Sequence, residues 1–497
     1  MPVNFIPNDP SAGTTAPALR VQARHANRPA SRATFAFSNT AAEARYAPGT
    51  SGFVYWQCRE AALAAVDAWE LVAGNFPRWQ GNRRTLSLRQ DAGVDINAYY
   101  DRASFSFFHR AIGGTTFFSG ASTDVVAHEV GHGLLDVIRP DLWDAPYLET
   151  GAFHEAFGDC VAVLTGLTDR DTRRKLLAAT TTLKKKNFLE STAENLSEGI
   201  RRLDASHNAA EPRHAYNNLQ FQIPETLPFD GGPGELINEV HSFGMLFSGC
   251  FYDLIAAIFA SQANKTEATL LASTKTAGSL LVAGASTAII TPRFFQSVGR
   301  AMVFADEEQN GGENRDRIRT AFGRHGIMLG ANALLAPTTV LEGDAPRLAR
   351  TPTLAPNTRK DLLARLALRP TVRTSVGLTE LGGRRFARVV HVQNVALGTL
   401  DPRLRGVTAA APISVIVGES GGRPAVMGAI PELVSTEREV TSFVQSLLKN
   451  NQIELGGQRA PAAATTDLRR TVSQPTHRIA SAGRKRVLAR ARFQCGC

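Results

Sequence analysis

The chain has 497 residues, 43% of them hydrophobic and 20% charged, so it is too long for one ordinary domain and apolar enough to bury a core. Its 55 Lys and Arg outnumber its 45 Asp and Glu, which gives a formal net charge of +10 that is most visible at the two ends. The start lacks the features of a Sec signal peptide, and no run of about 18 apolar residues predicts a membrane span. We therefore expect a protein of two or three domains that is cytoplasmic or exported without a Sec signal peptide.

The odd number of cysteines argues against a disulfide framework. Cys58, Cys160 and Cys250 lie in apolar, helix-like surroundings that are typical of buried thiols, whereas Cys495 and Cys497 are at the end of the chain. This pattern favours a reducing compartment.

The first part of the chain, residues 1–45, is rich in Ala, Ser, Thr, Pro and Arg. We expect a flexible basic arm there, and contact with nucleic acid is the alternative. Residues 60–75 have the apolar spacing of an amphipathic helix. The stretches 85–88 and 104–108 alternate like strands, with 97–100 between them, so this part of the chain combines a sheet with a helix.

A His-Glu-x-x-His motif lies in an apolar run of helical spacing over residues 123–138. The spacing places His128 and His132 one turn apart on one face, where two imidazoles can bind one zinc ion. Glu129 is then positioned to take a proton from a water molecule at the metal. The alternative is a helix whose two histidines are merely paired or exposed.

A second helical run begins near Gly151 and carries His154, Glu155 and Asp159. A catalytic zinc needs three protein ligands and one open position, and Glu155 can supply the third ligand. Asp159 lies one turn further on the same face, where its carboxylate can orient a ligating histidine. His154 competes for the role of third ligand, but on a helix it points about 100° away from Glu155.

These residues resemble the thermolysin-like zinc metallopeptidases, in which His-Glu-x-x-His is followed by Gly-Ala-x-x-Glu-Ala-x-x-Asp. Residues 97–100 resemble the family's peptide-binding edge strand, and residues 239–244 resemble the segment with its transition-state histidine. The resemblance covers roughly residues 50–330. It implies an α+β fold with a two-lobed catalytic region, in which a sheet-plus-helix N-terminal lobe spans 46–160 and a mainly helical C-terminal lobe spans 161–335.

The resemblance also implies roles for individual residues. His241 would donate a hydrogen bond to the oxyanion that forms during hydrolysis, and Tyr147 is a candidate second donor. Asn97 and Ala98 would align the substrate backbone, and Arg201 would bind a substrate carbonyl. A core histidine satisfied by a backbone carbonyl and an exposed arginine in a salt bridge are the structural alternatives for His241 and Arg201.

Two further features of the family are incomplete in this sequence. The family orients its transition-state histidine with an acidic residue, for which Glu235 and Glu239 are candidates, although neither has the expected offset from His241. Asp124 matches a family calcium ligand, but the other acidic residues of that site are not evident after Asp159. The resemblance allows calcium, but the sequence does not support it.

After a Pro-, Ala- and Thr-rich linker at 336–358, residues 359–455 are predicted to form a small appended α/β module. Within it, 386–392 and 413–417 have the composition of strands, and 437–449 has the pattern of a helix. No catalytic set of residues occurs in this module, which suggests a binding domain or a folding aid.

The last residues, 456–497, are predicted to form a basic, disordered tail, since no acidic residue occurs from Arg469 onward. Such a tail is usually solvated, and binding to nucleic acid or to an anionic surface is the alternative.

Taken together, the sequence predicts a zinc metalloendopeptidase that hydrolyses peptide or protein substrates, with zinc as its cofactor and Glu129 as its general base. The alternative is a non-catalytic interaction protein that keeps the metallopeptidase fold and binds an anionic partner through its basic ends.

Overall fold

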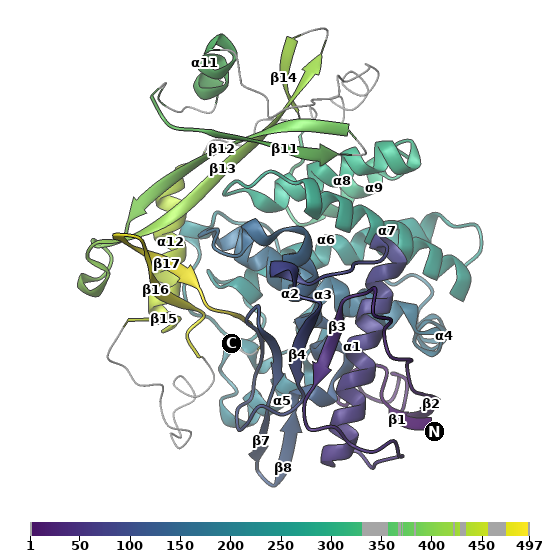
Figure 1. Cartoon of the computed structure of the whole chain (residues 1–497). Helices are drawn as coiled ribbons and strands as arrows, with labels where there is room; N and C mark the ends of the chain where they lie inside the picture. The colour runs from purple at the N-terminus through teal and green to yellow at the C-terminus, as the bar shows by residue number, and fades with distance from the viewer. Residues whose placement is uncertain are drawn as a thin grey trace.

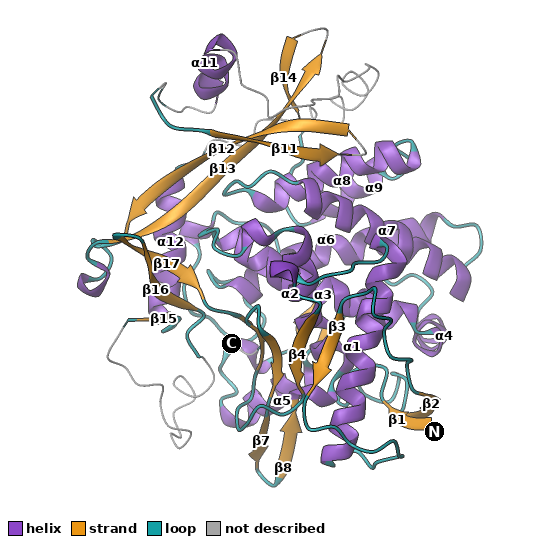
Figure 2. Ribbon diagram, viewed as in Figure 1, coloured by secondary structure: helices purple, strands orange, loops and turns teal. Residues whose placement is uncertain are grey.

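The computed structural model describes residues 2–330, 356–365, 369, 371–381, 384–420, 423–427, 434–455 and 474–495. Within these residues the fold is α+β, as predicted: a helical body lies between a sheet of the N-terminal lobe and a second sheet of the C-terminal module (Figures 1 and 2). The linker at 336–355 and the stretch 456–473 lie outside the described residues.

The helices of the described residues are α1 Ser51–Ala73, α2 Thr123–Ile138, α3 Leu148–Thr168, α4 Arg170–Ala179, α5 Glu194–Leu203, α6 Val240–Ser261, α7 Glu267–Thr287, α8 Phe294–Asn310, α9 Arg315–Arg324, α11 Pro356–Arg365 and α12 Thr436–Lys449. The strands are β1 Pro2–Phe5, β2 Arg20–Ala23, β3 Thr34–Phe37, β4 Thr85–Arg89, β5 Ala98–Tyr100, β6 Ser104–Phe107, β7 His109–Ile112, β8 Thr115–Phe118, β9 Ser191–Thr192, β10 Arg213–His214, β11 Ser375–Leu381, β12 Arg384–Ala396, β13 Val407–Ser420, β14 Arg423–Met427, β15 Ile453–Glu454, β16 His477–Ala482, β17 Lys485–Arg490 and β18 Phe493–Gln494.

The N-terminal segment is folded onto the helical body, so the prediction of a flexible arm over residues 1–45 is wrong for the described part. β1 pairs with β2, and β3 joins the main sheet of the lobe. Arg20 reaches Asp169 at 2.6 Å, and Arg32 reaches Glu70 on α1 at 2.6 Å. The arginines that make this segment basic therefore hold it to carboxylates elsewhere in the fold.

Helix α1 starts nine residues before the predicted helix at 60–75, because Thr50 caps it: the Thr50 side chain accepts a hydrogen bond from the backbone N–H of Phe53. The helix ends at Gly74, whose positive φ of 78° is favourable for glycine. The apolar spacing identified the helix, but the position of its start depended on a cap that lies outside the apolar pattern.

The sheet of the N-terminal lobe has the strand order β18-β5-β6-β4-β3. β3, β4 and β6 are parallel, whereas β5 is antiparallel to β6. On its other side β5 is covered by β18, which comes from the far end of the chain and also runs antiparallel to it. The strand expected at the edge of the sheet is therefore already paired with a segment of the same protein.

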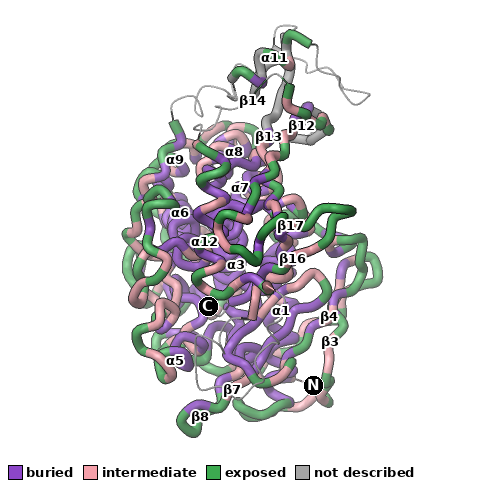
Figure 3. Tube along the Cα trace, turned by 90° about the vertical axis from the view of Figure 1, so that its left-hand side faces the viewer, coloured by how far each residue is buried: buried purple, intermediate pink, exposed green. Residues whose placement is uncertain are grey.

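The helical body surrounds α3, which is buried over almost its whole length and packs against α1, α2 and α6 (Figure 3). By length and composition α6 is apolar enough to cross a membrane, with a mean hydropathy of 1.7, contrary to the sequence-based expectation that no such run exists. However, 89% of that window is buried inside the fold. Its apolar character is therefore explained by its place in the core.

The C-terminal sheet has the order β11-β12-β13-β17-β16-β15, with β14 paired to β13. β16 and β17 belong to the segment predicted to be a disordered tail, so that prediction is wrong for residues 474–495. The tail was misassigned because basic composition does not exclude strand pairing. β17 pairs with its neighbour β16 and also with β13, about 80 residues earlier.

The module is not separate from the catalytic region, because buried residues of both belong to one hydrophobic core. Arg293 of the helical body forms an ion pair with Glu439 of α12 at 2.8 Å, and Ser414 donates its backbone N–H to Ile290 at 3.1 Å. The predicted strands at 386–392 and 413–417 are present within β12 and β13. The module thus forms one side of the helical body.

Candidate active site

Two helices supply the candidate metal-binding side chains. α2 carries His128, Glu129 and His132, and it begins at Ser122, whose side chain caps the backbone N–H of Val125. α3 carries Glu155 and Asp159. The pair α2 and α3 is among the most closely packed pairs of elements in the fold.

Glycines allow this close approach. A Cβ atom added at Gly131 of α2 would lie 2.9 Å from the Cα atom of Gly158 on α3, and one added at Gly158 would lie 2.6 Å from Nδ1 of His128. Both distances are too short for real carbon contacts. Because neither residue has a side chain, the two helices come close enough for ligands from both to converge.

The nitrogen and oxygen atoms of His128, His132 and Glu155 converge on one point. Oε2 of Glu155 lies 3.2 Å from Nε2 of His128 and 3.6 Å from Nε2 of His132. These contacts lack hydrogen-bond geometry, and the three atoms have no hydrogen-bond partner among the described residues. All three side chains are almost completely buried. Buried, unpartnered donor atoms that face one another fit a zinc ion with two imidazole ligands and one carboxylate.

Asp159 and Arg213 support the first histidine. Oδ1 of Asp159 lies 2.8 Å from Nδ1 of His128, and Nη2 of Arg213 lies 2.9 Å from the same oxygen. Although burial alone would raise the pKa of Asp159, the charges of Arg213 and His128 lower it to about 2. Asp159 therefore stays ionised and holds the His128 ring with Nε2 turned toward the cluster.

Replacing Asp159 with Asn is expected to weaken zinc binding about 10- to 100-fold, because the ring of His128 loses the acceptor that fixes its orientation. Competition with a chromophoric chelator measures the affinity. Asp171→Asn, the same change at a half-exposed carboxylate on α4, is the control and should leave the affinity unchanged. Equal affinity in the Asp159→Asn variant and the wild type would contradict this role.

Glu129 follows His128 on α2 and is completely buried. Neither of its carboxylate oxygens has a hydrogen-bond partner within the described part of the chain. Burial raises the pKa of Glu129 to about 8, with the charge of His128 opposing and that of Glu155 adding to the shift. Because both of its oxygens lack a partner among the described residues, this carboxylate is available to act as a general base that later returns the proton.

His241, near the start of α6, faces the same cluster. Its Nε2 atom lies 3.0 Å from Oε2 of Glu155, and its Nδ1 atom lies 2.8 Å from Oε1 of Glu239. Glu239 also caps α6 by accepting the backbone N–H groups of His241 and Ser242. The acidic partner of His241, which the sequence left open, is therefore Glu239. Its position as the N-cap of α6 is the feature that could have identified it.

Two predicted site residues are not near the cluster. Arg201 is half exposed on α5, where it pairs with Glu198. The hydroxyl group of Tyr147 donates to the backbone oxygen of Pro412 at 3.1 Å, in the interface with the C-terminal module. Both assignments are corrected: the arginine beside the cluster is Arg213, which no local motif marked in the sequence.

His154, the competing ligand, is buried on α3, but its ring stacks on that of Phe493, with centroids 3.9 Å apart. Burial lowers its pKa well below the usual value. Glu155 contacts the rings of His128, His132 and His241, whereas the ring of His154 packs on Phe493, so His154 forms part of a wall beside the cluster.

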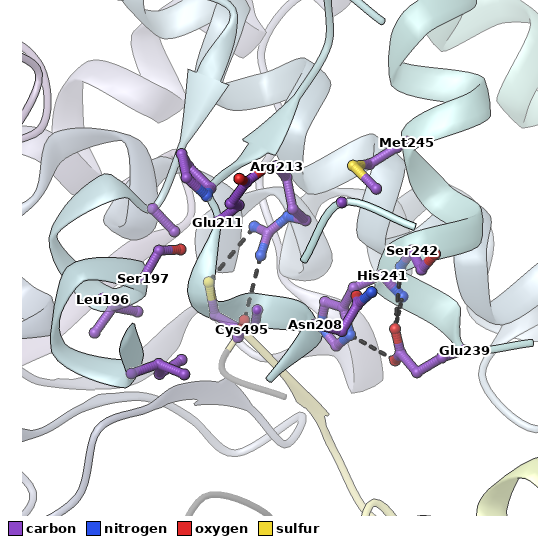
Figure 4. A pocket seen from close by; sticks show the side chains of 15 residues that line it. Leu196, Ser197, Asn208, Glu211, Arg213, Glu239, His241, Ser242, Met245 and Cys495 are labelled. Atoms are coloured by element: carbon purple, nitrogen blue, oxygen red, sulfur yellow. Dashed lines mark hydrogen bonds and ion pairs between the residues drawn. The ribbon is translucent and has the colours of Figure 1, made fainter. Parts of the chain in front are cut away.

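The end of the chain lies in the cleft between the sheet and the helices. The backbone N–H of Cys495 donates to Ala98 at 2.9 Å, and Asn97 donates from Nδ2 to Oε1 of Gln494 at 3.4 Å. The thiol of Cys495 lies beside Arg213, in a pocket that His241 and Glu239 also line (Figure 4). The two residues expected to align a substrate backbone thus contact the protein's own C-terminal strand.

A second acidic cluster lies away from these residues. The carboxylates of Asp9, Asp124 and Glu194 come from distant parts of the chain and lie within 4.8 Å of one another. Burial, with a contribution from the charge of Asp124, raises the pKa of Asp9 to about 7, and the same causes raise that of Glu194 to about 10. The acidic neighbours of Asp124 that were not evident in the sequence are therefore supplied by the N-terminal segment and by α5.

These raised pKa values predict that the protein loses stability as the pH rises. An unfolded Asp loses its proton near pH 4, whereas folded Asp9 keeps it to about pH 7, so this contribution is complete below about pH 4 and is lost as the pH rises through 7. We expect the Tm to fall by at least about 5 °C between pH 5 and pH 8, and added Ca²⁺ to reverse the fall.

Differential scanning fluorimetry across this pH range tests the expectation. Glu194→Gln removes one of the three carboxylates and should flatten the pH dependence. Glu313→Gln, at an exposed site, should leave it unchanged. A Tm that is the same at pH 5 and pH 8 would show that the cluster does not control stability.

Comparison with known proteins agrees with this geometry. Residues 118–333 match the family described as fungalysin metallopeptidase (M36). No curated protein matches the sequence. The match includes α2, α3, β10 and α6, and with them the candidate zinc ligands, Glu129, Arg213 and His241. Over residues 118–333 the chain is therefore similar to the fungalysin metallopeptidases, a thermolysin-like family of zinc peptidases.

Proposed function

We propose that this protein is a zinc-dependent endopeptidase whose catalytic centre comprises His128, His132, Glu155, Glu129 and His241. One observation carries the proposal: an extended peptide backbone, that of the terminal strand β18, lies between β5 and the ligand cluster with a carbonyl oxygen 2.6 Å from Nε2 of His241. The cleft therefore has the shape and the hydrogen-bonding groups to hold a peptide beside the proposed metal site.

In this proposal His128, His132 and Glu155 hold the zinc ion. When bound there, zinc would polarise the peptide carbonyl and make a water molecule a stronger nucleophile. Asp159 keeps His128 oriented for this task through its contact with Nδ1. The burial of the three ligands excludes bulk water and strengthens every charge interaction in the cleft.

Glu129 and His241 handle the proton and the developing charge. The carboxylate of Glu129 takes a proton from the attacking water and delivers it to the nitrogen of the leaving amine. Nδ1 of His241 faces the carboxylate of Glu239, and Nε2 faces the backbone oxygen of Gln494, which lies where a substrate carbonyl would lie, so a protonated Nε2 donates toward that oxygen. A donor of this kind stabilises the oxyanion more than it stabilises the neutral carbonyl.

Cleavage within a chain, rather than only at its end, is supported by the path of the bound strand. It enters the cleft from β17, where the backbone N–H of Arg490 donates to Asp144 at 2.8 Å. Several residues before the bond at His241 are thus accommodated. An aminopeptidase would instead need a group that closes the cleft before the bond.

The alternative of a non-catalytic protein that binds an anionic partner has less support. Its basic tail was expected to be free for such a partner. In the fold, however, Arg490 donates from Nε to the backbone oxygen of Trp143, and Arg486 donates to that of Arg405. Arg492 lies over the ring of Tyr99.

The test is hydrolysis of a quenched generic peptide by the zinc-loaded full chain, with the cut positions determined by mass spectrometry. Because the terminal strand occupies the cleft, the peptide is supplied in excess, and a Phe493→Ala variant is assayed in parallel. We expect internal cuts that disappear with a chelator and return with zinc. Zinc binding without hydrolysis in either form would favour the non-catalytic alternative, and cuts only at peptide ends would make the protein an exopeptidase.

A further inference from the structure

The terminal strand lies in the cleft in one register. Phe493 pairs with Tyr100 and Gln494 with Tyr99 in an antiparallel ladder. The backbone N–H of Cys495 continues the ladder by donating to Ala98 at 2.9 Å. This strand addition fixes the position of every peptide bond from Phe493 to Cys495 relative to α2.

The carbonyl of one of these peptide bonds, and the carbonyl that follows it, both have polar contacts. The carbonyl oxygen of Gln494 lies 2.6 Å from Nε2 of His241, which is itself 3.0 Å from Oε2 of Glu155. The next carbonyl, that of Cys495, accepts a hydrogen bond from Nη1 of Arg213 at 3.3 Å. The carbonyl of the Gln494–Cys495 bond is therefore the one that faces the proposed metal ligands.

Phe493, the residue that precedes Gln494, is held by aromatic and cationic groups. The ring of Phe493 stacks on those of His154 and His132, with centroids 3.9 Å and 4.9 Å away, and the guanidinium group of Arg490 lies 4.0 Å from the ring centroid. Phe493 is 1% exposed, and Cys495 is 3% exposed. Stacking and burial of this extent hold the segment firmly in the cleft.

We propose that this protein cleaves its own chain at the Gln494–Cys495 bond. The proposal rests on the endopeptidase function proposed above and identifies a substrate of that site. The reaction is a hydrolysis: the C–N bond between Gln494 and Cys495 breaks, and a C–O bond from water forms. Glu129 carries the water proton to the nitrogen of Cys495, leaving a carboxylate on Gln494 and a free amine on Cys495.

Because the strand is part of the same molecule, the reaction is intramolecular. The bond is already held in the cleft, so no encounter step is needed, and the rate does not depend on protein concentration. The strand also covers β5 and excludes other peptides from the ladder.

The experiment starts from full-length protein purified in a chelator. Zinc is added, and intact mass is recorded over time at two protein concentrations that differ tenfold. We expect the mass to fall by that of residues 495–497, leaving Gln494 as the new C-terminus, at the same rate at both concentrations. Zinc binding is measured in parallel by competition with a chelator, so that metal loading is known independently of cleavage.

Three variants sharpen the test. Glu129→Gln should bind zinc and keep its full mass. Cys495→Pro removes the N–H group that donates to Ala98 and should slow cleavage at least about 100-fold, while hydrolysis of added peptide by the Phe493→Ala form remains the reference for catalytic competence. Arg484→Gln, an exposed change in the turn before β17, should be cleaved at the wild-type rate.

The outcomes separate the two proposals. If zinc-loaded protein keeps residues 495–497 while the Phe493→Ala variant hydrolyses added peptide, self-cleavage is wrong and the peptidase function stands. If neither form cleaves anything, both proposals are wrong. A rate that rises in proportion to protein concentration would show cleavage between molecules and would overturn the intramolecular reaction.

Discussion

Replacing Glu129 with Gln is expected to lower kcat/KM for peptide hydrolysis by at least about 10³-fold without loss of zinc. Gln has nearly the shape of Glu but cannot take a proton from water, and a positioned general base contributes about 10²- to 10⁴-fold to such reactions. The ligand atoms of His128, His132 and Glu155 are unaffected, so the metal site should stay intact. Steady-state kinetics in the Phe493→Ala background and zinc content by mass spectrometry measure the two effects separately.

Glu267→Gln is a suitable control, because its side chain is partly exposed and pairs with the exposed Arg170. It should retain wild-type activity. Loss of zinc together with activity in Glu129→Gln would instead make Glu129 a residue that builds the metal site. Full activity in that variant would exclude it as the base.

Replacing Gly158 with Ala is expected to disrupt the metal site by disturbing the packing of α3 against α2. The added Cβ would lie 2.6 Å from Nδ1 of His128, so either the ring or the helix must move. Overpacking of this kind typically costs about 1–3 kcal/mol of stability. We expect a Tm several degrees lower and zinc affinity reduced at least about 10-fold, since His128 can no longer reach Asp159 and the cluster together.

Gly323→Ala provides the matched comparison. Gly323 lies within α9, and a Cβ added there would meet no atom within 4 Å. This variant should be as stable as the wild type or more stable by about 0.5–1 kcal/mol, because alanine is the better helix former. If both glycine variants behaved alike, the close approach of α2 and α3 would not be what positions His128.

The relative positions of two cluster residues were predictable where both residues lie on the same helix. His128 and His132 share a face because they are four residues apart, and any helix imposes that relation. Glu155 and Asp159 share a face of α3 for the same reason. The sequence also marked both helices by their apolar spacing, and both are present with closely similar bounds.

The second set of contacts was not predictable in this way. Arg213 reaches Asp159 from β10, a strand of two residues without a pattern of its own. Arg201, chosen from the sequence, had the right charge in a nearby segment but lies on the exposed side of α5. Nothing local distinguishes the two arginines, because their roles depend on which loop folds over α3.

The tail shows the same limit more strongly. Its basic composition predicted disorder, yet Gln494 contacts His241 across 253 residues of sequence. Strand pairing is set by backbone hydrogen bonds that any residue except proline can form, so composition alone says little about which segment will cover a sheet edge.

By itself, the sequence predicted the class of chemistry, because the proposed zinc ligands and the proposed base follow from spacings along two helices whose geometry is fixed. Only the tertiary structure decided which arginine and which acid support them, and what occupies the cleft. Those contacts join residues far apart in the chain, and their free energy depends on packing that no local pattern encodes. The assignment of the C-terminal strand to the place of a substrate belongs wholly to this second kind of information.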